Sequence, residues 1–280
     1  MSAVRIALFQ AQSGIEPAAN ADRLVEAVRQ AAAGGAAMLF TPEMSGMLDR
    51  DRQRALGKAR REDDDEVLAA VRVAAAEAGI WVHLGSLALR GEGDKLVNRG
   101  FVIDDSGDVR ARYDKIHLFD VDLPTGESWR ESAMYDAGAS AVVVSGTPVG
   151  KLGLTICYDL RFPELFQRLS EAGADVIAVP AAFTVPTGKA HWQVLMRARA
   201  IEAELFIVAA AQAGHHEDGR DTYGHSLVAD PWGELIVEMD GQPGLAFAEI
   251  DLSLIADVRA RIPVHQHRRA IPPVGPPVAN

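Results

Sequence analysis

The chain contains one cysteine, Cys157, in the stretch LTICYDLRFPE. An isolated strand cysteine is usually a small buried hydrophobic residue. Here an apolar, β-branched run precedes the thiol, and an amphipathic helix is predicted to begin near Phe162. The thiol would then lie at the carboxyl end of a strand, where open α/β sheets place ligands and where backbone N–H groups can stabilise an oxyanion. Cys157 is therefore a candidate nucleophile, with a buried spacer as the alternative.

A thiol that attacks an amide needs a base, an oxyanion donor and a proton for the departing nitrogen. None of the eight histidines lies in a local motif that pairs it with Cys157. Two charged residues stand out instead: Glu43 in MLFTPEM comes just after an apolar run, and Lys115 in RYDKIHLFD lies between alternating apolar and aromatic residues. Taken singly, each is more often a surface group. Residue types alone therefore leave a histidine base open.

The elements that must position these residues alternate between strands and helices. Apolar, β-rich runs predict strands at Val4–Phe9, Ala36–Phe40, Ile80–Leu87, Val97–Ile103, Ala141–Val144, Leu152–Ile156, Asp175–Val179, Leu205–Ala211, Ser226–Ala229, Leu235–Met239 and Leu245–Ile250. Helices are expected at Asn20–Ala33, Asp65–Ala78, Phe162–Ala172 and Ala190–Ala203. Hairpin-like spacing in IDDSGDV and ADPWGEL adds antiparallel pairs, so the class is α/β with a mixed sheet.

No repeat or low-complexity linker divides the chain, and we interpret residues 1–280 as a single domain. The densely charged segment Arg50–Asp65 is expected to be a solvated loop. The end of the chain, from about residue 262 to 280, is expected to be a Pro-rich tail, because IPPVGPPVAN suits neither a helix nor a central strand.

Composition limits the partners. With 28 Lys and Arg against 39 Asp and Glu the net charge is −11, which argues against nucleic acid or an anionic membrane. One cysteine cannot form an intramolecular disulfide or a thiolate metal cage, and no run of about 18 apolar residues occurs, so we expect a cytoplasmic protein. Neither a GxGxxG turn nor a Walker loop is present, and we expect no cofactor and no metal.

Three segments resemble, in chain order, the Glu, Lys and Cys segments of the nitrilase, or carbon–nitrogen hydrolase, superfamily: TPEM, YDKIHLFDVDLP and GLTICYDLRFPEL. Further blocks, including YGHSLVADPWGE and IPVHQHRR, are similar to its Nit branch, which contains ω-amidases and deaminated glutathione amidases. The resemblance covers nearly the whole chain. It implies a Glu43-Lys115-Cys157 triad with a second glutamate, Glu131, chosen over Glu127 because its spacing from Lys115 fits the family pattern better.

The resemblance also implies a fold and an assembly. The fold would be a four-layer αββα sandwich of two mixed β-sheets. Homodimers or higher even homo-oligomers are usual in the family, and the predicted helix Phe162–Ala172 is the candidate interface, with a core-facing helix as the alternative.

In the implied mechanism Glu43 takes the thiol proton as Cys157 attacks the carbonyl carbon, and Lys115 with the backbone N–H of Tyr158 stabilises the oxyanion. Ammonia leaves, and water hydrolyses the thioester with Glu43 again as base. Glu131 would orient Lys115 or hold the substrate amide. A histidine-dependent cysteine hydrolase and a non-catalytic binding protein with the same fold are the alternatives.

The substrate expected from the resemblance is deaminated glutathione, with α-ketoglutaramate-type monoamides, nitriles and N-carbamoyl acids as alternatives. Thr187 and Lys189 fall where a substrate-binding loop is expected, with plain surface residues as the alternative. Because the net charge is negative, local cations should attract the substrate's carboxylates, and Lys189, His215 and His216 are the candidates. Arg161 is similar to an arginine near the family's nucleophile and is expected to form an ion pair that shapes the turn after Cys157, with substrate contact as the alternative.

Overall fold

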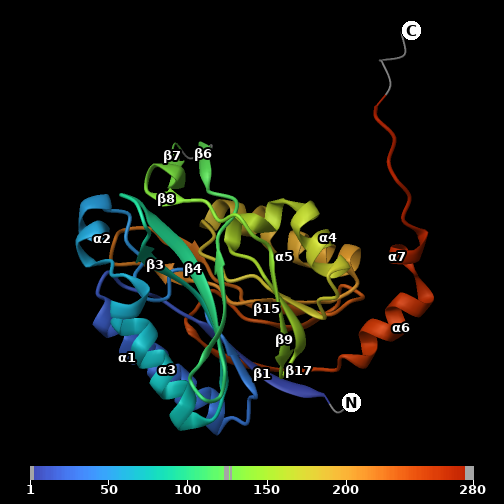
Figure 1. Ribbon diagram of the computed structural model, residues 1–280, viewed down its shortest axis with the longest axis horizontal. Helices are drawn as coiled ribbons and strands as arrows, with labels where there is room; N and C mark the ends of the chain where they lie inside the picture. Colours follow the sequence, from blue (N-terminus) through green and yellow to red (C-terminus); the bar gives the residue numbers. More distant parts are fainter. Residues whose placement is uncertain (1–2, 123–125, 127, 275–280) are drawn as a thin grey trace.

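The computed structural model describes residues 3–122, 126 and 128–274 of the chain. Two β-sheets pack face to face between two layers of helices (Figure 1). One sheet has seven strands and the other six in the described part of the chain. This arrangement confirms the predicted α/β class and the four-layer αββα sandwich of two mixed sheets.

The seven-stranded sheet has the order β17-β1-β2-β3-β4-β5, with β8 paired to β4. Strands β1, β2 and β3 are parallel, whereas β17, β4 and β5 join antiparallel. The bounds of these strands are β1 Val4–Gln10, β2 Met38–Phe40, β3 Trp81–Arg90, β4 Leu96–Ile103, β5 Val109–Asp114, β8 Tyr135–Asp136 and β17 Gly244–Ile250.

The six-stranded sheet has the order β16-β15-β12-β11-β10-β9, with a parallel centre and antiparallel outer pairs. Its strands are β9 Val142–Thr147, β10 Gly150–Leu154, β11 Val176–Ala178, β12 Phe206–Ala209, β15 Leu227–Ala229 and β16 Leu235–Glu238. Two short ribbons lie outside the sheets and pair β6 Asp120–Asp122 with β7 Ser128–Arg130, and β13 Ala213–His215 with β14 Asp221–Tyr223.

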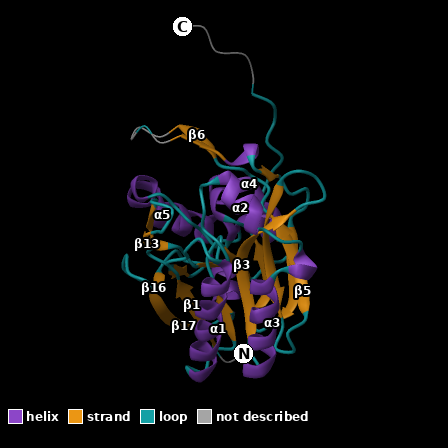
Figure 2. Cartoon of the chain, turned by 90° about the vertical axis from the view of Figure 1, so that its left-hand side faces the viewer, coloured by secondary structure: helices purple, strands orange, loops and turns teal. Residues whose placement is uncertain are grey.

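Alternating side chains assign the two faces of each sheet. On β1, Ile6 and Leu8 belong to the core shared with the six-stranded sheet, whereas Ala7 packs in the core beneath the outer helices. The period of two in a strand produces this division. Helices α1 Pro17–Ala33 and α3 Glu66–Ala78 lie side by side on the outer face of the seven-stranded sheet (Figure 2), and α4 Pro163–Glu171 and α5 Val185–Ala203 cover the other.

The starts of two helices differ from the prediction. Helix α1 begins at Pro17, which suits the first turn, and Asn20 lies inside the helix, where its side chain accepts from the Gly14 N–H and donates to the Gly14 and Gly46 carbonyls. Helix α5 begins at Val185 and not at Ala190, again with a proline in its first turn. The segment expected to be a substrate-binding loop is therefore the first part of α5.

The charged segment Arg50–Asp65 is not simply a loop. It contains α2 Arg52–Lys58, whose N-cap Asp51 accepts from the Arg54 N–H, and the 3₁₀ turn η1 Glu62–Asp64. The prediction of a solvated loop was wrong because a good N-cap and one buried contact, from Ala55, suffice to fix a short helix against the body.

The end of the chain carries helical segments that the sequence reading missed. Helix α6 Ser253–Arg261 buries Ile255 and Val258, and the short α7 Val264–His267 follows it. After α7 the described chain runs away from the body without regular structure up to residue 274 (Figure 1), and the last part of the predicted tail lies outside the described residues. No helix in the described ranges is long and apolar enough to cross a membrane.

Candidate active site

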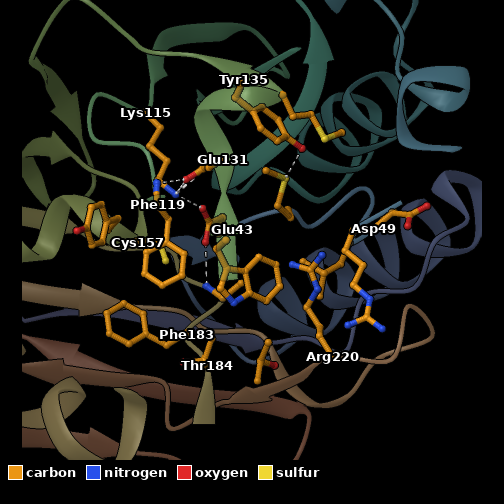
Figure 3. A pocket seen from close by; sticks show the side chains of 18 of the residues that line it. Glu43, Asp49, Lys115, Phe119, Glu131, Tyr135, Cys157, Phe183, Thr184 and Arg220 are labelled. Atoms are coloured by element: carbon orange, nitrogen blue, oxygen red, sulfur yellow. Dashed lines mark hydrogen bonds and ion pairs between the residues drawn. The ribbon is translucent and has the colours of Figure 1, made fainter. Parts of the chain in front are cut away.

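Three strand ends bring the predicted catalytic residues together. Glu43 follows β2, Lys115 follows β5, and Cys157 follows β10, so that residues from both sheets meet at one edge of the sandwich. All three side chains are buried, with exposed residue fractions of 4%, 2% and 8%. Figure 3 shows Glu43 and Glu131 pointing toward the ammonium of Lys115, with Cys157 beside them. The structure thus places the four predicted residues in one cluster.

The ammonium of Lys115 lies between two carboxylates. Its Nζ donates to Glu43 Oε1 at 2.9 Å, and to Glu131 Oε2 at 2.8 Å and Oε1 at 3.0 Å. Asn98 on β4 donates from Nδ2 to both glutamates, at 2.9 Å to Glu43 and 3.2 Å to Glu131. Backbone N–H groups complete the set, from Ala182 to Glu43 and from Phe119 to Glu131. Both carboxylates are therefore held in fixed orientations.

The thiol begins a tight turn. Cys157 has a φ of 51°, in the left-handed region that non-glycine residues rarely adopt, and its N–H donates to the Pro180 carbonyl at 2.9 Å. The 3₁₀ turn η3 Cys157–Arg161 then leads into α4. A backbone held in this region at a thiol is typical of sites where function requires a sharp strand-to-helix turn.

Asp159 holds this turn from within. Its fully buried carboxylate accepts from the Ile156 N–H at 2.9 Å and from the Tyr113 hydroxyl at 2.6 Å, and its other oxygen accepts from the His117 N–H at 3.0 Å. Burial and the nearby carboxylate raise the pKa of Tyr113, which keeps this hydroxyl a donor. Asp159 is thus a positioning residue for the nucleophile, Cys157.

The charges of the cluster follow from burial and mutual attraction. Burial alone would raise the pKa of Glu43, but the charge and hydrogen bond of Lys115 outweigh it, so the pKa is lowered from its usual 4.5. Burial would lower the pKa of Lys115, but Glu131 and Glu43 raise it well above its usual value. Burial and the charge of Glu43 raise the pKa of the Cys157 thiol. The resting site therefore pairs a neutral thiol with an ionised carboxylate and an ammonium.

A cavity of ≈ 480 Å³ opens onto the cluster. Glu43, Lys115, Glu131 and Cys157 line it. Its other walls include five aromatic residues and four arginines, Phe119, Trp129, Tyr135, Tyr158, Phe183, Arg50, Arg130, Arg161 and Arg220, together with methionines, small polar residues and the acids Asp49 and Asp221. No histidine is among the described residues that line it, which leaves the histidine-base alternative without structural support. The described residues also hold no group of three or more His, Cys, Asp or Glu side chains arranged for a metal ion.

Of the other residues predicted to contact the substrate, some line the cavity and some do not. Tyr158 and Thr187 line the cavity, Thr187 from the first turn of α5. Lys189 is exposed and does not line it. His215 is exposed and bonds Asp221 through Nδ1 at 2.9 Å. His216 is buried between the Ser13 carbonyl and the Thr222 hydroxyl, and burial lowers its pKa.

The prediction that Lys189, His215 and His216 supply positive charge at the mouth was therefore wrong. Arginines that lie far apart in the sequence line the cavity instead, together with the acids Asp49 and Asp221. Arg161 also differs from expectation: it has no carboxylate partner among the described residues. Its Nη2 lies 3.3 Å from His191 Nδ1, and its guanidinium lies 5.7 Å from the centre of the Phe183 ring. Arg161 is thus a guanidinium without a carboxylate partner in the described part of the chain, four residues after Cys157.

Sequence reasoning missed several residues that complete the site. Asn98 and Asp159 bond to the cluster or to its turn, and Arg220 reaches the cavity from the turn between β13 and β14. Asn98 carried a usable signal, because a polar amide within the apolar run of β4 must find partners when buried. Arg220 carried none, because only the fold brings the β13–β14 turn beside β7.

The family model described as carbon-nitrogen hydrolase matches residues 5–260, so this chain belongs to the carbon–nitrogen hydrolase family. It is an enzyme that hydrolyses carbon–nitrogen bonds of amides. The resemblance inferred from the Glu, Lys and Cys segments is confirmed.

Similar proteins of known name support a narrower comparison. Deaminated glutathione amidase of Bos taurus is 40% identical over 271 residues, which cover 94% of this chain and 81% of that protein. The protein of the same name from Yersinia enterocolitica is 37% identical over 283 residues, covering 100% of this chain and 98% of the relative.

Solved structures agree in fold. The C. elegans NitFhit protein has a TM-score of 0.90 at 38% identity and covers 96% of this chain, which spans 66% of that longer protein. A mutant of the amidase from Nesterenkonia sp. AN1 has a TM-score of 0.76 at 27% identity, covering 94% of this chain and 99% of that one. In that mutant structure, acrylamide is added to the active site cysteine of the amidase.

Proposed function

We propose that this enzyme hydrolyses a small carboxylated amide through a thioester on Cys157, with Glu43 as base and acid and Lys115 as an oxyanion donor. The observation that carries the proposal is the position of Lys115 Nζ, which lies 2.9 Å from Glu43 and 2.8 Å from Glu131 in a cavity that the thiol also lines. This geometry supplies a nucleophile, a proton acceptor and a positive charge at one point.

The pKa shifts constrain the first step. Because the pKa of Glu43 is lowered and that of Cys157 is raised, transfer of the proton to Glu43 before attack would be unfavourable. Proton transfer should therefore accompany formation of the sulfur–carbon bond, whose electron pair neutralises the developing thiolate. The carbonyl electron pair moves to oxygen, where Lys115 and the backbone N–H of Tyr158 would stabilise it.

Collapse of the tetrahedral species breaks the carbon–nitrogen bond. The departing nitrogen takes the proton from Glu43 and leaves as ammonia from a primary amide, or as an amine from a substituted one. Water then adds to the thioester and gives a proton to Glu43, and the sulfur leaves and recovers that proton. Glu131, bonded to Lys115 through both oxygens, would keep the ammonium in place during both halves.

Deaminated glutathione is the substrate that we propose, since relatives that are 37–40% identical over most of the chain bear its name. This molecule carries carboxylates and a substituted amide, so its leaving group is an amine. Arg161 supports the proposal, because a guanidinium without an acidic partner close to the nucleophile suits the carboxylate of the acyl part. Thr187 would contact the same part of the substrate from α5.

The test is kcat/KM for deaminated glutathione and for α-ketoglutaramate, measured side by side at one ionic strength. We expect deaminated glutathione to be better by at least about tenfold, a difference of about 1.4 kcal/mol in transition-state binding. Equal values, or a preference for the shorter amide, would reject this substrate and favour an ω-amidase. A panel of nitriles and N-carbamoyl acids completes the comparison.

We also propose that the enzyme is a homodimer or a higher even homo-oligomer. The predicted interface was α4, but its apolar residues Leu165, Phe166 and Leu169 are buried in the core. Helix α5 is the better candidate, because Val194 and Ile201 are 66% and 49% exposed on it. Analytical ultracentrifugation of wild type and Val194→Asp should show a dimer that the substitution weakens.

The remaining proposals concern the chain as a whole. We propose that residues 1–280 form one domain with a Pro-rich tail from about residue 262, consistent with the family match over residues 5–260. A cytoplasmic location would keep the thiol of Cys157 reduced, as the proposed chemistry requires. Small-molecule amides, and neither nucleic acid nor membrane, remain the proposed partners.

A further inference from the structure

Arg220 is an arginine that lines the cavity and that a buried carboxylate holds in place. Its Nε donates to Asp218 Oδ2 at 2.7 Å, and its backbone N–H donates to the other oxygen of Asp218 at 3.1 Å. The Arg220 side chain is 16% exposed, and that of Asp218 is completely buried. The Arg50 N–H also donates to Asp218, at 2.9 Å. A buried carboxylate thus fixes the orientation of this guanidinium before any ligand arrives.

The terminal nitrogens of Arg220 have no hydrogen-bond partner among the described residues. The guanidinium carbon lies 5.0 Å from the ring centre of Trp129, which also lines the cavity. The indole Nε1 of Trp129 is itself buried and has no partner in the described part of the chain. A buried donor without a partner is costly, so such a group points to an absent acceptor.

Arg161 and Arg220, two of the arginines that line the cavity without a full set of side-chain partners among the described residues, occupy different parts of it. Arg161 stands four residues after the nucleophile. Figure 3 shows Arg220 on the far side of Glu43 from Lys115 and Cys157. Asp49 does not compete for it, because that carboxylate is engaged by Arg54 at 2.6 and 2.8 Å. Asp221, the other aspartate that lines the cavity, bonds His215.

We infer that Arg220, together with the indole N–H of Trp129, binds a carboxylate on the leaving-amine side of the substrate. The inference rests on the proposed function and deepens it. In deaminated glutathione this group is the C-terminal carboxylate of the cysteinylglycine part, whereas α-ketoglutaramate has no such group. A planar guanidinium held through Nε presents its terminal N–H groups to a carboxylate in a fixed geometry. Arg220 is then a specificity-determining residue for substituted amides.

The experiment removes the positive charge of Arg220 and the negative charge of the substrate's C-terminal carboxylate separately. The substrates are deaminated glutathione and its C-terminal carboxamide, and the enzymes are wild type and Arg220→Gln. Arg72→Gln is the matched control, because Arg72 is likewise held through Nε, by the Gly107 carbonyl at 2.8 Å, but does not line the cavity.

We expect Arg220→Gln to lower kcat/KM for the carboxylate substrate by at least about tenfold and for the carboxamide by less than about threefold, since the two removals abolish the same contact. Arg72→Gln should leave both values unchanged. Trp129→Phe should lower the ratio of kcat/KM for the carboxylate substrate to kcat/KM for the carboxamide, by a smaller factor than Arg220→Gln does. An equal loss for both substrates, or none, in a folded Arg220→Gln would overturn the inference.

A measurement on wild type alone keeps the test independent of variant folding. Wild type should prefer the carboxylate over the carboxamide by about tenfold or more. Equal rates for the two would overturn the role of Arg220 while leaving the proposed function intact. If wild type turns over neither compound but hydrolyses another amide, the proposed substrate fails, and the assignment of Arg220 fails with it.

Discussion

Lys115→Met should destabilise the fold as well as abolish activity, because the ammonium stands between the buried carboxylate of Glu43 and that of Glu131, whose side chain is 12% exposed. At distances of 2.8 and 2.9 Å and an effective dielectric constant of about 20, each ion pair supplies about 6 kcal/mol of attraction, most of which offsets desolvation. Methionine fills the space but leaves Glu43 and Glu131 without a cation. We expect the free energy of unfolding near pH 7 to fall by about 3–5 kcal/mol, the usual loss when one partner of a buried pair is removed.

The loss of free energy of unfolding in Lys115→Met should be larger at high pH than at low pH. In wild type the folded pKa of Glu43 lies below 4.5, so its contribution is present above that pH and is lost only as the pH falls through the lower folded value. In the variant, burial acts without Lys115 and raises the pKa of Glu43 above that of the unfolded chain. The destabilisation that ionised, buried Glu43 causes in the variant then grows as the pH rises. The difference between wild type and variant should narrow from pH 8 to pH 5.

Urea denaturation of both proteins at pH 5, 6, 7 and 8 measures this difference. Lys95→Met is the matched control: Lys95 donates to the Ser132 carbonyl at 2.8 Å, but its side chain is 41% exposed, so its loss should cost less than about 1 kcal/mol at every pH. A Lys115→Met variant that is as stable as this control, or whose loss does not change with pH, would refute the electrostatic reasoning about the cluster.

Three further predictions concern catalysis. Cys157→Ala should abolish turnover while the free energy of unfolding stays within about 1 kcal/mol of wild type in urea titrations, and residual turnover would exclude a covalent route. Glu43→Gln should lower kcat by orders of magnitude, whereas His117→Ala should remain active, and the reverse pattern in steady-state assays would restore a histidine base. Because the pKa of Glu43 is lowered and that of Lys115 is raised, kcat/KM should be flat from about pH 6 to 9 and fall only on the acid side below about pH 4.5; an acid limb near pH 6.5 would indicate a titrating histidine.

The parts of the site that the sequence predicts are those set by local pattern. Glu43 and Cys157 each follow an apolar run that becomes a strand, and the carboxyl ends of such strands gather at a sheet edge. Lys115 follows β5, whose sequence VRARYD is not an apolar run and was not among the predicted strands. The resemblance to the nitrilase superfamily then indicated that Glu43, Lys115 and Cys157 form a triad. The fold class followed from the same runs, because strand–helix alternation and hairpin spacing are readable along the chain.

The parts that escaped prediction depend on contacts between distant segments. His216 looked like a surface cation, yet the backbone carbonyl of Ser13, far away in the sequence, accepts a hydrogen bond from its ring Nδ1 and makes burial possible. Arg220 gave no sign of its role in the sequence, because only the fold turns the carboxylate of Asp218 inward to orient it. Asp159 appears only as a polar residue after Cys157 until Tyr113 is placed against it. Pairings of this kind have no signature in a single sequence.

The central claim, that amide hydrolysis proceeds through a thioester on Cys157, is tested most directly by mass spectrometry of the acylated protein. Wild type is mixed with deaminated glutathione, quenched in acid within the first turnovers, and digested. The peptide that contains Cys157 should carry the mass of the acyl part without its leaving amine, and the adduct should disappear as substrate is exhausted. The same peptide from Cys157→Ala should carry none. Turnover without any adduct on this peptide, or an adduct that persists in Cys157→Ala, would contradict the claim.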